Sequence, residues 1–282
     1  MDIVLYTLEI RMAESNRFVN MALIGSTGFV GSTLCHQADF SAFYRSSTID
    51  KVAERSFDCV VCTAAPAQKW IANKEPSADL KNIERLIEHL KTVSCDTFVL
   101  ISTVDVFKSP IGIDEDTVVD ESELHPYGLH RRLLEKFVES HFDNHLIIRL
   151  PGLVGPGLRK NVIFDLLNDN NLHLIDSRAM YQFYPMVNLW SDIQTALSAG
   201  LQLVHLTAAP ISVADVSKQG FGKPFDHPWV NLPATYDMKT KHAQIFGAAG
   251  PYQYSERETI LAIRAYAQSE RRIAKSATGV SA

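Results

Sequence analysis

Two side chains near the middle of the chain have the types and the spacing that acid–base chemistry requires. Tyr127 and Arg131 stand four residues apart, so a helix places them on one face. A tyrosine hydroxyl can donate a proton to a carbonyl oxygen, but its ordinary pKa of about 10 makes it a weak acid. A neighbouring cation stabilises the phenolate and lowers that pKa. The pair therefore predicts proton transfer to or from a hydroxyl or keto group.

A third polar group, the hydroxyl of Ser102 or Thr103, is expected beside this pair. Both residues follow the apolar run 97–101, which we predict to be a strand. Ligands of open α/β sheets bind at the carboxyl ends of strands, so a hydroxyl at this position can hold the same substrate oxygen. A structural interpretation competes with this one, in which Tyr127 belongs to a helix start and Arg131 pairs with an acidic neighbour.

A glycine-rich segment near the N-terminus carries the sharpest motif. It lies between an apolar run expected to be a strand and residues 28–37, expected to be a helix. Gly25 permits a tight turn, Gly28 lets the backbone approach a pyrophosphate, and Gly31 lets helix and strand pack closely. The helix N-terminus adds N–H groups and the positive end of its dipole. The motif predicts a dinucleotide held by Gly25, Ser26, Thr27, Gly28, Phe29, Val30 and Gly31.

Arg45 bears on which dinucleotide is bound. NAD sites usually place an Asp or Glu at the end of the second strand, where it holds the ribose 2′-hydroxyl. This chain has no carboxylate in the segment 43–47, and Arg45 stands there instead. A guanidinium suits a phosphate, so we favour NADP. In the competing interpretation Arg45 is a solvated surface charge and the cofactor is NAD.

These motifs together resemble the extended short-chain dehydrogenase/reductase family, which contains NAD(P)-dependent epimerases, dehydratases and reductases of sugar nucleotides. The resemblance runs from Phe18 to about Phe246 and rests on the glycine turn and on further segments of the chain. These are 63–65, 79–90, 101–107, 126–128 with Glu135, 149–157, and 183–187 with Asp192. It implies a Rossmann domain followed by a small substrate domain. It also implies roles for individual residues. The catalytic ones are Thr103, Tyr127 and Arg131, and the further cofactor contacts are Ala64, Ala65, Ser102, Tyr127, Arg131, Pro151, Gly152 and Leu153.

One departure from the family pattern affects the expected mechanism. The family has Tyr-x-x-x-Lys, whereas this chain has Tyr127-x-x-x-Arg131. Arginine keeps the positive charge, but it cannot pass on a proton of its own because its pKa exceeds about 12. Two hypotheses follow. In the first, the protein is an NAD(P)-dependent enzyme acting on a hydroxyl or keto group of a nucleotide-linked sugar, with an altered proton route through His130 or water. In the second, it is an NAD(P)-binding sensor or scaffold with weak or no catalysis.

The order of apolar runs indicates an α/β protein with a doubly wound parallel sheet of Rossmann type and a small C-terminal substrate lobe. Residues 1–16 are an N-terminal extension of uncertain structure, 17–155 the dinucleotide-binding domain, and 156–282 mostly the substrate lobe, with segments around 186–208 returning to the sheet. In that lobe, Gln182 and Tyr184 are considered as substrate contacts, and the competing interpretation, which we favour, makes them ordinary partly buried residues. The strands are expected at 17–24, 42–44, 57–63, 97–101, 146–150 and 203–206, and the helices at 28–37, 49–55, 78–93, 128–142, 162–168, 192–200 and 259–275. Residues 107–126 are expected to form a loop.

Composition excludes several other classes of protein. With 282 residues, 46% of them apolar, the chain can bury a substantial core. A net charge of −5 disfavours binding to nucleic acid. No apolar run reaches the 18 residues of a membrane span, and no secretory signal is evident, so we expect a cytoplasmic location. Cys59 and Cys62 are expected to be core residues on opposite faces of a strand, and no metal site is predicted. A small-molecule substrate and a homodimer are the expected partners.

Overall fold

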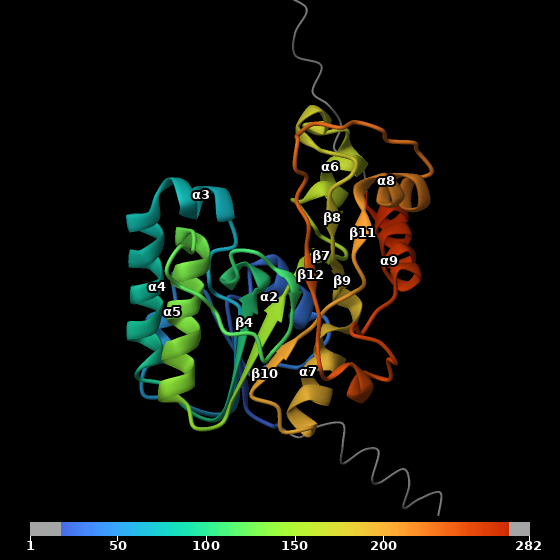
Figure 1. Cartoon of the computed structure of the whole chain (residues 1–282). Coiled ribbons are helices and arrows are strands. Elements are labelled where there is room, and N and C mark those ends of the chain that lie inside the picture. The colour runs from blue at the N-terminus through green and yellow to red at the C-terminus, as the bar shows by residue number, and fades with distance from the viewer. Residues whose placement is uncertain (1–17, 271–282) are drawn as a thin grey trace, which may run out of the picture. The chain divides into compact units, whose positions relative to one another are not determined.

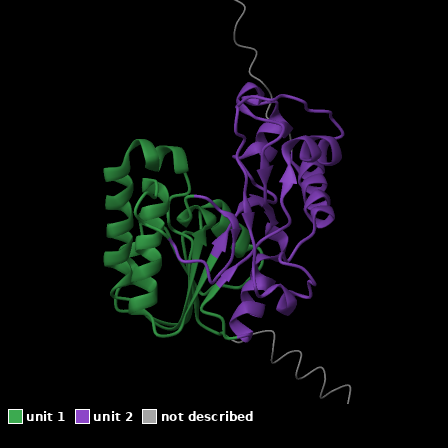
Figure 2. Cartoon of the chain, viewed as in Figure 1, with its two compact units in different colours: residues 1–108, 120–148, 200–203 green, residues 109–119, 149–199, 204–282 purple. Residues whose placement is uncertain are grey.

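The computed structural model describes residues 18–270 and divides them into two compact units. Unit 1 contains the described residues up to Lys108, together with Asp120–Ile148 and Gly200–Leu203 (Figure 2). Unit 2 contains Ser109–Val119, Arg149–Ala199 and the described residues from Val204 onward. The predicted extension 1–16 lies outside the described residues.

The main sheet has six strands in the order β10-β6-β4-β3-β1-β2, and most of it lies in unit 1 (Figure 1). Strand β1 pairs in parallel with β2 on one side and with β3 on the other, and β3 pairs in parallel with β4. The strand order reverses direction at β1, which is where open α/β sheets bind their ligands. The predicted doubly wound α/β fold is confirmed. The strands are β1 (Met21–Ile24), β2 (Ala42–Tyr44), β3 (Ser56–Cys62), β4 (Ser94–Thr103), β6 (His145–Leu150) and β10 (Leu203–His205).

The central strands are apolar because both faces of the sheet are buried. All four residues of β1 are buried, and in the register with β3 Met21 lies beside Cys59 and Ile24 beside Cys62. Cys62 belongs to the main core cluster, whereas Cys59 is on the other face of the strand. Burial raises the pKa of the Cys62 thiol to about 11, and all four cysteines are free thiols. The two residues are core cysteines, as predicted, and not a redox pair.

The helices of unit 1 contribute an apolar stripe to that core. In α4, Asp79, Ile83, Leu86 and Leu90 are buried at helical spacing, so one face of the helix turns inward. In α5 the buried stripe includes Leu134 and Val138 and begins with Tyr127 and Arg131. The predicted shared face of Tyr127 and Arg131 is therefore confirmed. The helices are α2 (Phe29–Cys35), α3 (Lys69–Lys74), α4 (Pro76–Leu90) and α5 (Pro126–His141), and a 3₁₀ turn covers Ile49–Val52.

Unit 2 contains three two-stranded sheets and several short helices. Strands β7 and β9 run parallel, β8 and β11 antiparallel, and β5 and β12 parallel. The prediction of a loop over the whole of residues 107–126 is therefore wrong, because Ile111–Ile113 forms β5. Pro110, Gly112 and Asp114 obscured this strand in the sequence. The elements are β5 (Ile111–Ile113), β7 (Gly152–Val154), α6 (Val162–Asn168), β8 (Met180–Tyr181), β9 (Phe183–Pro185), α7 (Leu189–Ser198), β11 (Ile211–Ser212), α8 (Val213–Asp215), β12 (Asp237–Met238) and α9 (Glu256–Ser269).

Two buried polar side chains hold unit 2 together. The Gln182 amide nitrogen donates to Thr207 Oγ1 and to two backbone carbonyls, and its oxygen accepts from the Met238 N–H at 2.7 Å. Asp192 Oδ2 accepts from the hydroxyls of Tyr184 at 2.6 Å and Tyr254 at 2.8 Å. Gln182 and Tyr184 are thus interior residues with internal partners, which favours the interpretation of both as buried structural residues.

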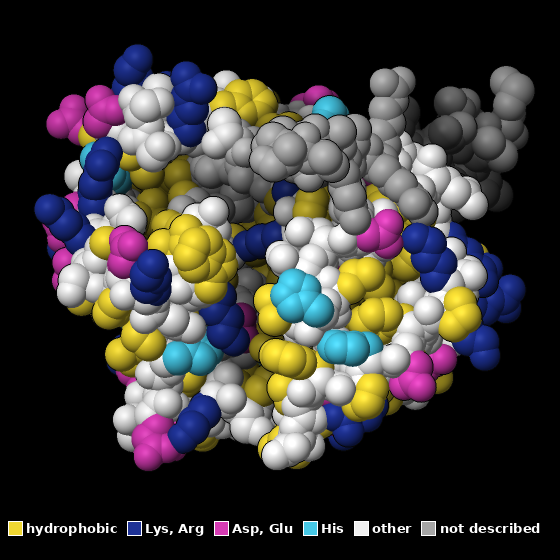
Figure 3. Space-filling model, turned by 90° about the horizontal axis from the view of Figure 1, so that it is seen from above, with side chains coloured by type: hydrophobic (Ala, Val, Ile, Leu, Met, Phe, Trp, Pro, Cys, Tyr) yellow, Lys and Arg dark blue, Asp and Glu magenta, His cyan; other side chains and the backbone are white. Residues whose placement is uncertain are grey.

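Neither a membrane-spanning helix nor a metal-binding cluster is found among the described residues. None of the helices described in residues 18–270 is long and apolar enough to cross a membrane. Basic and acidic side chains are interspersed on the face shown in Figure 3. Across the same residues, no group of three or more His, Cys, Asp or Glu side chains is placed to hold a metal ion.

Candidate active site

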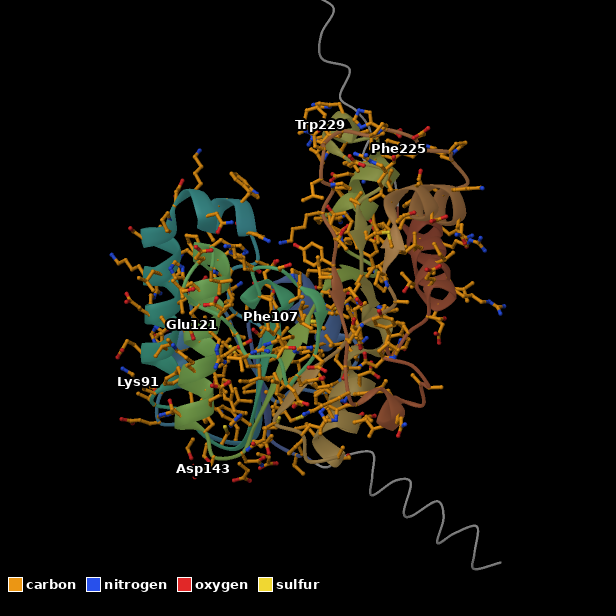
Figure 4. The ribbon with its side chains drawn as sticks, viewed as in Figure 1. Lys91, Phe107, Glu121, Asp143, Phe225 and Trp229 are labelled. Carbon is orange, nitrogen blue, oxygen red and sulfur yellow. The ribbon has the colours of Figure 1, made fainter. Side chains whose placement is uncertain are left out.

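The predicted acid–base residues lie in unit 1, where β4 ends and α5 begins. A 3₁₀ turn, Val104–Val106, follows β4, and the Thr103 hydroxyl accepts the Asp105 N–H at 3.1 Å. Phe107, labelled in Figure 4, directly follows this turn. The N-terminal turn of α5 packs against Asp105, since a Cβ at Gly128 would lie 2.1 Å from the Asp105 carbonyl oxygen. Only glycine allows this approach, which brings Tyr127 beside Thr103.

The start of α5 is fixed by two further side chains. His125 is its N-cap, and its Nδ1 accepts the Gly128 N–H at 3.0 Å. Pro126 follows at the first helical position, where the lack of an N–H costs nothing. Asn73 Oδ1, from α3, accepts the Tyr127 N–H at 3.0 Å. These bonds satisfy orphan donors of the first turn and hold the Tyr127 backbone in place.

Tyr127 is buried, with 8% of its surface exposed, and its pKa is raised above the ordinary value. Burial is the largest cause, because it disfavours the phenolate. The Arg131 charge and a hydrogen bond with Thr103 act in the opposite direction and lower the pKa, whereas the Asp105 charge raises it. The predicted effect of Arg131 on the tyrosine is present, but burial outweighs it.

Arg131 takes part in a buried ion pair that the sequence did not identify. Its two terminal nitrogens both donate to the Asp79 carboxylate, and the contact from Nη2 to Oδ1 is 2.9 Å. Nη2 also donates to the Pro66 carbonyl, and Nη1 donates to the Tyr127 carbonyl at 3.3 Å. The side chains of Arg131 and Asp79 are only 3% and 5% exposed. The competing interpretation, in which Arg131 pairs with an acidic residue, is therefore correct at the level of contacts.

This ion pair limits what Arg131 can do at the site. The guanidinium carbon lies 4.0 Å from the centroid of the Tyr127 ring, so the charge acts through the face of the ring. Both terminal nitrogens are fully engaged, and only the buried Nε lacks a partner among the described residues. The predicted contact of Arg131 with a cofactor would have to use Nε or break the pair. His130 joins the same network, with Nδ1 2.7 Å from Asp79 Oδ2.

Sequence reasoning missed a second cation at this site. Lys69, at the start of α3, places Nζ 2.8 Å from Asp105 Oδ1. Its side chain is 39% exposed, in contrast to Arg131. Lys69 and Asn73 are four residues apart and share a face of α3. This spacing is the feature of the sequence that could have indicated a role for Lys69. It was not used because the helix α3 was not predicted.

The glycine turn has the geometry that a dinucleotide requires. Gly25 has a φ of +93°, and a Cβ there would lie 2.7 Å from Thr63 Oγ1 and 2.8 Å from the Ala64 nitrogen. A Cβ at Gly31 would lie 2.1 Å from the Gly25 carbonyl oxygen. Gly28 is exposed and is the N-cap of α2 with no side chain over the helix end. The turn is therefore an open cradle of backbone, which fits a pyrophosphate.

The remaining predicted cofactor residues are distributed as follows. Arg45 is exposed just after β2, and Arg85 Nη2 donates to the neighbouring Ser46 carbonyl at 3.2 Å. Ser102 donates to the buried Glu135 carboxylate at 2.5 Å, so its hydroxyl is already engaged. The residues from Pro151 to Leu153 lie in unit 2, where β7 pairs with β9. Ala64 and Ala65 follow β3, and both are partly exposed.

Comparisons with known proteins agree with this fold. A dinucleotide-binding α/β protein of Rossmann type is the class that the sheet order and the glycine cradle define. The model of the NAD dependent epimerase/dehydratase family matches residues 42–175 of the chain. The matched segment includes Thr103, Tyr127 and Arg131 but begins after the glycine turn. No curated protein matches the chain in sequence.

Solved structures of low sequence identity share the fold. MoeE5 in complex with UDP-glucose and NAD is 15% identical, with a TM-score of 0.64 over 89% of this chain and 99% of that one. RMD from Pseudomonas aeruginosa complexed with NADPH is 16% identical, with a TM-score of 0.63 and the same coverage. A dTDP-4-dehydrorhamnose reductase from Yersinia enterocolitica is 16% identical, with a TM-score of 0.66 over 88% and 98% of the two chains. These structures show the same fold, and the family model over residues 42–175 agrees with the predicted resemblance to the short-chain dehydrogenase/reductase family.

Proposed function

We propose that this protein is an NAD(P)-dependent enzyme that changes the oxidation state or configuration of a carbon bearing a hydroxyl or keto group, with Tyr127 as the acid or base. The observation that carries the proposal is the joint placement of Thr103, Tyr127 and Arg131. The tyrosine is buried, the Arg131 charge and the Thr103 side chain both lower its pKa against the larger effect of burial, and its ring faces the guanidinium.

Each residue then has a defined task. The bound nicotinamide supplies or accepts the hydride. Tyr127 gives a proton to the substrate oxygen from its Oη, or takes one from it, according to the direction of the reaction. Thr103 holds the same oxygen through its hydroxyl. Arg131 stabilises the phenolate through the ring face and stays fixed by Asp79.

We propose NADP as the preferred dinucleotide. Arg45 directly follows β2, and Arg85, from α4, donates to the neighbouring Ser46 carbonyl, so two cations lie where a 2′-phosphate would need them. Calorimetric titration with NADPH and NADH tests this. We expect Arg45→Ala to weaken NADPH binding by about tenfold or more, the size of one charge-assisted hydrogen bond, and to leave NADH binding unchanged. Lys51→Ala removes the same charge from the nearby exposed 3₁₀ turn and is the control. An equal loss for both cofactors would refute the assignment.

We propose a nucleotide-linked sugar as the substrate class. The support is the family match together with the UDP-glucose named for one structural neighbour and the dTDP-linked substrate named for another. Oxidation of NADPH, or reduction of NADP, with a panel of nucleotide keto-sugars and hydroxy-sugars tests the proposal. Tyr127→Phe should lower turnover by about a hundredfold or more without weakening cofactor binding. Full turnover in this variant would refute the role of Tyr127. A homodimer is also proposed, and light scattering of the purified protein would test it.

One observation favours the alternative, a dinucleotide-binding sensor without turnover. The Asp79 ion pair engages both terminal nitrogens of Arg131, so the residue that replaces the family's lysine cannot use them to hold a cofactor ribose. The same substrate panel separates the two functions. Tight cofactor binding with no turnover on any member would support the sensor.

A further inference from the structure

We propose that Lys69 is a positioning residue for Tyr127, and that its ammonium supplies the solvent-linked positive charge that Arg131 cannot supply. This inference rests on the proposed function of Tyr127 as acid or base. It concerns a residue outside the Tyr-x-x-x-Arg motif and on a different helix.

The first step of the argument is the state of Arg131. Its side chain is 3% exposed, and its terminal nitrogens are bound to Asp79 and to the carbonyls of Pro66 and Tyr127. An arginine in such a pair keeps its charge and its place through a reaction cycle, because it does not release a proton. Arg131 therefore provides a constant positive charge beside Tyr127, and its guanidinium is not in contact with bulk solvent.

The second step is the placement of Lys69. Asn73, one helical turn further along α3, bonds directly to the Tyr127 backbone at 3.0 Å. Residues four apart share a helix face, so Lys69 is on the face of α3 that meets the start of α5. Its ammonium bonds to Asp105 at 2.8 Å, and the Asp105 N–H bonds to Thr103 Oγ1 at 3.1 Å. The Thr103 side chain in turn acts on Tyr127, since it is one of the groups that lower the pKa of the tyrosine.

The third step is the freedom of the Lys69 ammonium. Its side chain is 39% exposed, so it reaches solvent from the same point at which it bonds to Asp105. An ammonium has three N–H donors, and Asp105 takes one of them. Among the described residues no second partner of Nζ is found, which leaves donors for water or for a ligand hydroxyl.

The charges around the tyrosine hydroxyl decide how Lys69 acts. Lys69 and Arg131 are the cations, Asp105 is the anion, and His125 is the nearby titratable ring. Asp79 and His130 lie behind Arg131. The Lys69 charge lowers the pKa of Tyr127, and it also lowers the pKa of His125, for which burial is the larger cause. Removing the Lys69 charge must therefore raise both values.

The experiment replaces Tyr127 by 3-fluorotyrosine, which ionises at lower pH than tyrosine, and follows its ¹⁹F signal through a pH titration of the full-length protein. We expect Lys69→Gln to raise the midpoint by about one pH unit, the lower end of the effect of a close charge. Lys69→Arg should restore the native midpoint, and Asp105→Asn should lower it. Lys74→Gln, which removes the same charge from the exposed end of α3, should leave it unchanged.

Three results would overturn the proposal. They are an unchanged midpoint in Lys69→Gln, an equal rise in Lys69→Arg, and an equal rise in Lys74→Gln. The second of these would show that Lys69 acts through packing and not through charge. Far-UV circular dichroism of each variant establishes that it is folded. Because this titration needs no substrate, its outcome is independent of whether Tyr127→Phe abolishes turnover, which is the test of the proposed function.

Discussion

Removing the charge of Asp79 should destabilise the protein far more than removing a surface charge from the same helix. Asp79 and Arg131 are 5% and 3% exposed, and Asp79 also bonds to His130. Breaking a buried ion pair by removing one partner costs about 3–5 kcal/mol, because the other charge stays buried without compensation. A chain of this size loses about 2–4 °C in melting temperature per kcal/mol, so Asp79→Asn should melt about 6–20 °C lower.

Urea unfolding followed by circular dichroism at pH 7 measures this loss of unfolding free energy. The control is Glu88→Gln, which breaks the exposed ion pair with Lys91 at the end of α4, where Figure 4 labels Lys91. Exposed pairs contribute about 0–1 kcal/mol, so this variant should be close to native. The double variant Asp79→Asn/Arg131→Met should lose less than the sum of its single variants, because no uncompensated charge remains.

The pH dependence of the same variant gives an independent check. The Arg131 and His130 contacts outweigh burial and hold the pKa of Asp79 below its ordinary value of 3.8. The stability contributed by this depressed pKa is present above pH 3.8 and is lost as the pH falls through the folded-state value. The difference between the native protein and Asp79→Asn should therefore shrink on acidification. A loss at pH 7 no larger than that of Glu88→Gln, or a difference that grows in acid, would refute the reasoning.

Three further predictions follow from contacts in the two units. Arg131→Lys, which restores the family pattern, should destabilise the protein by about 1–3 kcal/mol, because one ammonium cannot satisfy both Asp79 oxygens and the Pro66 carbonyl. A greater stability of this variant in urea unfolding would contradict the prediction. Burial raises the pKa of Asp192, so its contribution to the free energy of unfolding is greatest below pH 3.8 and is lost as the pH rises through the folded-state pKa. The difference in unfolding free energy between the native protein and Asp192→Asn should therefore fall from pH 4 to pH 7. A rise of this difference would contradict the prediction. Gly31→Ala should lower the melting temperature and weaken NADPH binding by calorimetry, because its Cβ would lie 2.1 Å from the Gly25 carbonyl; unchanged binding would contradict the predicted cradle.

The elements that the sequence predicted well are those defined by local chemistry. The strand 42–44 and the helix 162–168 were predicted with their observed bounds, and the glycine turn lies between β1 and α2 as expected. Apolar runs and glycine positions specify such elements within a few residues of the chain. The short helix α3 was not predicted because its six residues, Lys69–Lys74, are too few to show an apolar periodicity.

The parts of the candidate site that escaped prediction depend on distant pairing. Tyr127 and Arg131 were predicted to share a face because their spacing is local. The partner of Arg131 is Asp79, 52 residues away, and the partner of Lys69 is Asp105, 36 residues away. Nothing in a single sequence shows which of 32 acidic residues will face a given cation, because the sheet and helix packing decides it.

The division of the chain has a consequence for how the protein is made. The path passes between the two units after residues 108, 119, 148, 199 and 203, so neither unit is a continuous stretch of sequence. The Ile147 N–H donates to the Gln202 carbonyl at 2.8 Å, which joins β6 to the segment leading into β10. During synthesis, the main sheet therefore lacks its edge strand β10 until residue 205 has been added. By then the part of unit 2 up to α7 has already been made. A fragment cut at residue 155 would expose the edge of β6, and an isolated dinucleotide-binding unit would have to be rebuilt by grafting residues 200–205 onto it.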